Sequence, residues 1–137
     1  MKYLLLDVKN REIKTVEANG LDDYYNLIGC RCIDIIHRRI GDVEVEIVID
    51  DEGTLVDKPK ISAIDIDGTP MLCGNLLVAS GRVTDDGELT ELTEEEVDEI
   101  MDNIATITTS VYKEPYPAFV EVDYWCYFTW QVGNNDI

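Results

Sequence analysis

Basic side chains are scarce in this chain. Its 137 residues include 11 Lys and Arg against 29 Asp and Glu, which gives a formal net charge of -18 at pH 7. Between Arg82 and Lys113 there is no Lys or Arg at all. Nucleic acids and anionic membranes would be repelled over a Debye length of about 8 to 10 Å at cellular salt. We therefore expect neither a nucleic acid nor a membrane as a direct partner.

The signatures of common enzyme classes are missing as well. His37 is the only histidine, and no G-x-S-x-G elbow is present to place a nucleophile beside it. The glycines form neither a G-x-G-x-x-G nor a G-K-[ST] phosphate loop. From these absences we predict a non-enzymatic protein without a cofactor.

Metal-ligand spacing is incomplete. Asp65 and Asp67 are placed like the start of a calcium loop, but Gly68-Thr69-Pro70 follows and supplies no further ligands at alternate positions. The four cysteines lack the C-x-x-C spacing of a zinc site and are expected to be free thiols: Cys30, Cys32, Cys73 and Cys126. We predict no metal site.

Long apolar runs are also lacking. The first run, Tyr3–Leu6, ends at Asp7, far short of a signal peptide or a membrane span. We therefore expect the protein to stay in the cytoplasm where it is made. A hydrophobic content of 45% over this length predicts a single domain with one core, residues 1–137.

The residue patterns that are present predict an α+β fold with a mainly antiparallel sheet, two short helices and a C-terminal aromatic β-hairpin. Strands are expected at 2–8 and 11–18, joined as a hairpin, and at 32–40 and 43–49, joined at Gly41-Asp42. The nearly all-apolar run at 72–80 is expected to be either a central strand buried on both faces or a short extended segment under a helix.

A first short helix is expected at 21–28. It has Leu21, Tyr24, Tyr25 and Ile28 on one face and Gly29 at its end. A second is expected at about 94–104. There Thr93 and Glu96 form a capping box, and the apolar stripe comprises Val97, Ile100, Met101 and Ile104.

The terminal hairpin is expected from 106–112 and 118–132, in an extension (105–137) of the core (1–104). Five aromatic residues crowd its second strand: Tyr124, Trp125, Tyr127, Phe128 and Trp130. This number is too large to alternate between core and solvent, so one aromatic face is expected to be exposed and to support self-association.

The order of these features resembles a family of phages and mobile elements known as domain of unknown function 3846. The residues that carry the resemblance are Leu27-Ile28-Gly29-Cys30, the turn Asp50–Leu55, the strand Cys73–Val78 and the helix start Leu92–Val97. The resemblance covers residues 1 to about 104. It implies an origin in a phage or an integrated element, and it implies no catalytic residue.

The strongest charge signal is a run of carboxylates in and before the second helix. We predict that these residues bind a basic surface of a host protein: Asp85, Asp86, Glu88, Glu91, Glu94, Glu95, Asp98, Glu99 and Asp102. The sharpest form of this hypothesis is a nucleic-acid mimic that occupies the groove of a defence protein, such as a CRISPR effector. A solvated face that only keeps the protein soluble is the other interpretation, and the sequence leaves both open.

Two further functions stay open. The cationic cluster Arg31, Arg38 and Arg39 could hold the phosphate of a nucleotide signal whose base stacks on Tyr124 or Trp125. The same arginines could instead only offset the surrounding carboxylates. In the other alternative, the aromatic hairpin makes the chain a structural, self-assembling phage protein.

Overall fold

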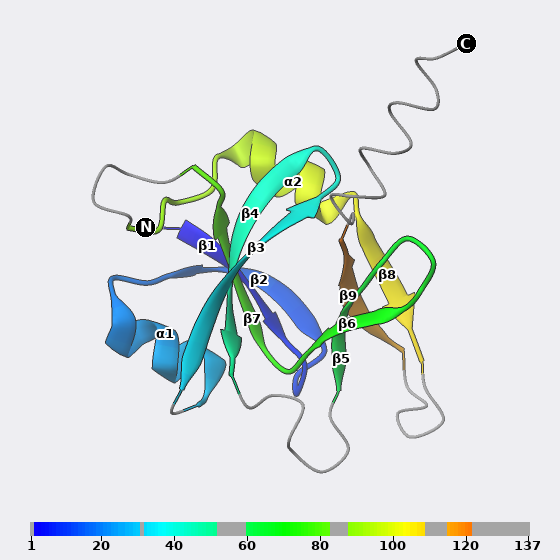
Figure 1. The fold of residues 1–137 in the computed structure, drawn as a ribbon, viewed down its shortest axis with the longest axis horizontal. Helices are drawn as coiled ribbons and strands as arrows, with labels where there is room; N and C mark the ends of the chain where they lie inside the picture. The colour runs from blue at the N-terminus through cyan, green and yellow to red at the C-terminus, as the bar shows by residue number, and fades with distance from the viewer. Residues whose placement is uncertain (1, 31, 52–59, 83–87, 109–114, 122–137) are drawn as a thin grey trace.

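The structure is a computed structural model that describes residues 2–30, 32–51, 60–82, 88–108 and 115–121 (Figure 1). The described strands form two sheets, one of five strands in the order β2-β1-β7-β4-β3 and one of four strands in the order β6-β5-β9-β8. Their bounds are β1 Lys2–Asp7, β2 Glu12–Glu17, β3 Ile33–Ile40, β4 Val43–Asp50, β5 Ile61–Ile64, β6 Pro70–Cys73, β7 Leu76–Ser80, β8 Ile104–Ile107 and β9 Tyr116–Val120. The helices are α1 Leu21–Ile28 and α2 Glu94–Met101.

The strand pairings confirm the α+β class. All of them are antiparallel except the parallel pair β5 and β9. The expected hairpins β1–β2 and β3–β4 are present, and β4 meets β3 across the turn Gly41-Asp42 with Ile40 opposite Val43. The division into two sheets is an addition to the prediction, which gave one.

The apolar run at 72–80 was expected to be one central strand or a short extended segment under a helix, and the structure instead divides it between two strands. Its second half is β7, which is buried along its whole length between β1 and β4, as expected for a central strand. Its first half, Leu72-Cys73, belongs to β6 in the other sheet. The chain turns between them at Gly74, where φ is 83°, and the Asn75 side chain accepts a hydrogen bond from the Val8 N–H at 3.0 Å.

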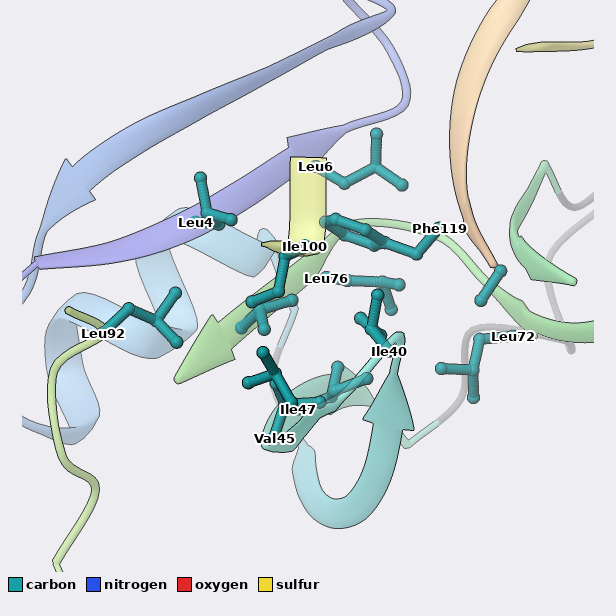
Figure 2. Close-up of a cluster of buried hydrophobic side chains, with 13 residues drawn as sticks. Leu4, Leu6, Ile40, Val45, Ile47, Leu72, Leu76, Leu92, Ile100 and Phe119 are labelled. Carbon is teal, nitrogen blue, oxygen red and sulfur yellow. The ribbon is translucent and has the colours of Figure 1, made fainter. Parts of the chain in front are cut away.

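The two helices pack on opposite faces of the five-stranded sheet (Figure 1). Beneath α1, Tyr24 and Ile28 join Tyr3, Leu5 and the alternate side chains of β7. On the other face, Ile100 of α2 packs with residues of both sheets (Figure 2). Both faces of the central strands are thus removed from water, which explains their unbroken apolar character.

Local signals in α2 are confirmed at its start and corrected at its end. The Thr93 hydroxyl accepts from the Glu96 N–H at 3.1 Å, and the Glu96 carboxylate accepts from the Thr93 N–H at 3.0 Å, so the capping box is complete. The helix ends at Met101 rather than near 104, because Ile104 already starts β8. Met101 is 43% exposed and is therefore not part of the buried stripe.

The terminal hairpin is confirmed in part. β8 and β9 pair antiparallel, with Ala105 opposite Ala118. The aromatic residues 124–130 lie outside the described residues. β9 is not an edge strand: it lies between β5 and β8, and Phe119 is fully buried in the core that both sheets share (Figure 2).

Among the residues that the structure describes, no helix is long and apolar enough to cross a membrane.

Candidate functional site

Four carboxylates form an outward row on α2, which we call the α2 acidic surface: Glu94, Glu95, Asp98 and Asp102. All four are exposed. Within the described ranges of the chain, none of them takes part in a salt bridge. Each therefore leaves its full charge available to a partner.

The remaining acid of the first turn, Glu96, is turned inward. Its carboxylate accepts hydrogen bonds from the Ser80 hydroxyl at 2.9 Å and from the Arg82 guanidinium at 3.1 Å. Burial alone would raise the pKa of Glu96, but the hydrogen bonds from Thr93, Ser80 and Arg82 outweigh it and lower the pKa. Glu96 thus anchors α2 to the end of β7 and is a structural residue.

Arg82 is the cation that organises this side of the molecule. Its guanidinium donates to the Ser80 hydroxyl at 3.0 Å and to the Glu91 carbonyl oxygen at 3.0 Å, in addition to Glu96. It thereby ties together β7, the segment before α2 and α2 itself. In the part of the chain that the structure describes, Arg82 forms its salt bridge with Glu96 at 3.1 Å and not with a carboxylate of the α2 acidic surface.

The other predicted partner-binding acids differ in their surroundings. Glu99 is half-buried and accepts a hydrogen bond from the Asp42 N–H at 3.2 Å, so it holds the β3–β4 turn. Glu91 is exposed and accepts from the Lys2 N–H at 3.1 Å, and Glu88 is exposed. Asp85 and Asp86 lie outside the described residues. The structure thus brings part of the predicted set together on one helix.

The charge density of this helix approaches that of duplex DNA. From Glu94 to Asp102 the helix rises about 12 Å, at about 1.5 Å per residue. A duplex presents about one charge per 1.7 Å of its axis, or about seven charges over that length. The four carboxylates of the α2 acidic surface and Glu99 supply five over the same length. The match in density is close, and it is confined to a short stretch.

The predicted arginine cluster is not gathered into one pocket in the described structure. Arg38 forms an ion pair at 2.9 Å with Glu121, whose residue is 2% exposed, whereas Arg39 lies 3.9 Å from both Asp42 and Glu44. Successive side chains of β3 point to opposite faces, so Arg38 and Arg39 diverge. Arg31, Tyr124 and Trp125 lie outside the described residues. The contacts of Arg38 and Arg39 fit charge compensation.

The acidic turn at Asp65 has a structural role. One oxygen of the Asp65 carboxylate accepts from the Asp67 N–H at 2.9 Å and from the Thr69 N–H at 2.8 Å. Cys30, Cys32 and Cys73 are free thiols. In the described part of the chain no three metal-ligating side chains gather into a possible ion site.

A hollow of about 490 Å³ beside the start of α1 was not anticipated from the sequence. Tyr3 and Tyr24 line it, with their hydroxyl oxygens 3.4 Å apart, and Glu88 lies on it as well. The helical spacing placed Leu21 on the buried face of α1, but Leu21 is 57% exposed and lines this hollow. The only sequence signal for the hollow was Leu21, an apolar residue at the first position of the helix, directly after Asn19-Gly20.

Comparison with known proteins gives one match. A family described as a domain of unknown function, DUF3846, matches residues 1–105. No curated protein matches the chain. No solved structure matches it. The match ends at Ala105, before β9, although β9 fills the middle of the second sheet.

Proposed function

The chain belongs to the DUF3846 family, and from that premise we propose that it is a non-enzymatic accessory protein that binds a basic host protein through the α2 acidic surface. The observation that carries the proposal is the row of four exposed carboxylates without a salt bridge in the described structure. The proposal includes an origin in a phage or mobile element and a place of action in the host cytoplasm.

The partner class follows from the charge geometry. The α2 acidic surface carries four charges, against the about seven that a duplex presents over the same length. Such a row is complementary to grooves that bind nucleic acid, so the proposed partner is a nucleic-acid-binding defence protein of the host. The helix supplies charge without phosphate chemistry or duplex shape. Discrimination between such grooves therefore requires further residues, among which Glu99 lies on α2 and Glu91 just before it.

The cost of keeping these charges together supports a role for them. Glu94, Asp98 and Asp102 are spaced by four residues along the helix, and each like-charged pair at this spacing costs a few tenths of a kcal/mol. The first-turn acids recover part of this cost because they lie at the positive end of the helix dipole. The acids of the last turn gain nothing from the dipole, and a solubilising role alone would not require them at these positions.

A charge-removal variant with a matched control tests the proposal. The test variant carries Glu94→Gln, Glu95→Gln, Asp98→Asn and Asp102→Asn, all at exposed positions. The control removes the same number of exposed carboxylates elsewhere: Glu12→Gln, Asp22→Asn, Asp51→Asn and Asp67→Asn. Both variants should fold, and equality of their circular dichroism spectra with that of the parent checks this.

Binding is measured against purified bacterial nucleic-acid-binding defence proteins, with and without duplex DNA as competitor. The parent and the control should associate fast, lose affinity steeply as salt rises and be displaced by DNA. The test variant should bind at least about fourfold more weakly, at about 0.2 to 1 kcal/mol for each of the four exposed charges lost. Equal affinity of the test variant and the parent at low salt would show that the row is only a solubility feature.

A further inference from the structure

The hollow beside α1 has a lining that combines apolar side chains with two tyrosines and one carboxylate. Its volume of about 490 Å³ lies within the range of small-molecule pockets, about 300 to 1,000 Å³. At its mouth are two aliphatic side chains that are unusually exposed for their type, Leu21 at 57% and Ile35 at 42%. A ligand that covers these exposed aliphatic groups would remove their apolar area from water, which is favourable for binding.

The polar groups of the hollow converge on one side. Tyr3 and Tyr24 are both buried, and their rings meet edge to face with centroids 6.1 Å apart. Their hydroxyls are 3.4 Å apart, longer than a usual O–H···O hydrogen bond of about 2.5 to 3.0 Å. A phenol hydroxyl donates one hydrogen bond and can accept others, so both groups have the chemistry to accept from an N–H or O–H donor.

The electrostatics of the hollow select the charge of what it binds. Burial raises the pKa of Tyr3, the hydrogen bond to Tyr24 raises it further, and the carboxylates of Glu91 and Glu88 add to the effect. Two carboxylates thus act on the Tyr3 hydroxyl, and one of them, Glu88, lines the hollow. The N-terminus of α1 adds little positive potential, because Asp22 and Asp23 occupy its first turn.

We propose that this hollow binds a small organic cation, with an aromatic or branched aliphatic body against Leu21, Ile35 and Tyr24 and an amine directed at Glu88 and the tyrosine hydroxyls. The apolar mouth supplies affinity through buried area. The carboxylate and the hydroxyls supply the charge preference, since each accepts hydrogen bonds from an ammonium. Anionic ligands, nucleotides among them, are disfavoured in the same site.

This site is independent of the α2 acidic surface. The hollow lies on the face of the five-stranded sheet that α1 covers, whereas α2 packs on the other face. Either proposal can therefore fail without the other.

Three probes separate charge from shape. Tryptamine has a bicyclic body and an amine, indole-3-acetate has the same body with a carboxylate, and ethylamine has the amine with almost no body. Each is titrated into the full-length, ¹⁵N-labelled protein, and the amide shifts are followed. Saturable shifts with tryptamine at Ala18, Leu21 and Leu89, residues that line the hollow, are the expected result. Neither of the other two probes should produce them at the same concentration.

Two variants at exposed positions assign the contacts. Glu88→Gln should weaken tryptamine about twofold to fivefold, the range for one exposed ion pair. Ile35→Ala should weaken it by loss of apolar contact. Asp67→Asn, which removes one exposed charge from the β5–β6 turn, is the matched control and should bind like the parent.

Three titration results with the parent protein would each overturn the proposal: no saturable shift at the hollow, equal binding of indole-3-acetate, or tryptamine shifts confined to α2, as expected for a counterion gathering on the acidic helix. Unchanged tryptamine affinity in Glu88→Gln would overturn the charge assignment and the proposal with it.

Discussion

Replacing Phe119 by alanine should destabilise the protein more than any other single change at the C-terminal end of its described part. Phe119 is fully buried and belongs to the core cluster that joins the two sheets, together with Leu6, Leu72 and Leu76 (Figure 2). A Phe→Ala change in a core costs about 3 to 5 kcal/mol, from lost transfer energy and from the cavity left behind. That is a large fraction of the roughly 5 to 15 kcal/mol by which a domain is stable.

Urea denaturation followed by circular dichroism measures the effect. With a slope of about 2 kcal/mol per M, a loss of about 4 kcal/mol lowers the midpoint by about 2 M. Val120→Ala, at the next position along β9 and only half-buried, is the control and should lower the midpoint far less. If the two variants had equal midpoints, β9 would not be part of the core, and the strand order of the second sheet would be refuted.

Three further outcomes are expected. Glu96→Gln should lower the free energy of unfolding by about 1 kcal/mol at neutral pH, measured by urea denaturation. Because the pKa of Glu96 is lowered in the folded state, this extra stability of the parent is complete above the ordinary value of 4.5 and is lost as pH falls through the folded-state pKa. Extra stability that persisted or grew in acid would contradict the assignment. Arg38→Ala should cost about 2 kcal/mol, because it removes the 2.9 Å ion pair of the buried Glu121 carboxylate; an unchanged thermal melting point would argue against the Arg38–Glu121 pair. Gly41→Ala should lower the stability more than Gly68→Ala, although both glycines have positive φ. A Cβ at Gly41 would lie 2.5 Å from the Asn103 side chain and 2.6 Å from the Glu99 side chain, whereas a Cβ at Gly68 would meet open space. Calorimetric melting temperatures in the reverse order would refute this packing.

Features set by neighbouring residues were predictable from the sequence. The capping box of α2 needs only Thr93 and Glu96, three positions apart, and the structure has both of its hydrogen bonds. The hairpins β1–β2 and β3–β4 follow from alternating strands joined by short turns, and they too were predicted. In each case the interacting groups lie close along the chain.

Features set by distant residues were not predictable. At the break between Leu72 and Leu76, Asn75 accepts a hydrogen bond from the distant Val8 N–H. Met101 has the spacing of the apolar stripe, but it is the last residue of α2. The pairing of β5 with β9 gives no pattern in either strand. In the candidate site, the exposure of Glu94, Glu95, Asp98 and Asp102 followed from their periodicity on a helix, whereas the hollow required α1, β1 and β3 to be placed first.

The place of β9 in the second sheet bears on how the protein is made. Ala63 of β5 pairs with Phe119 of β9, 56 positions further along the chain. At about 5 to 20 residues per second, a ribosome takes about 3 to 10 s to synthesise that interval. During those seconds one side of β5 has no strand to pair with, and an unpaired strand edge is a template for association with other chains. The growing chain becomes more acidic during this interval: residues 1–63 hold 13 Asp and Glu against 9 Lys and Arg, and residues 1–118 hold 26 against 11. Copies of the unfinished chain therefore repel one another increasingly as synthesis approaches β9, so the acidity seen on the finished surface also protects the unfinished one.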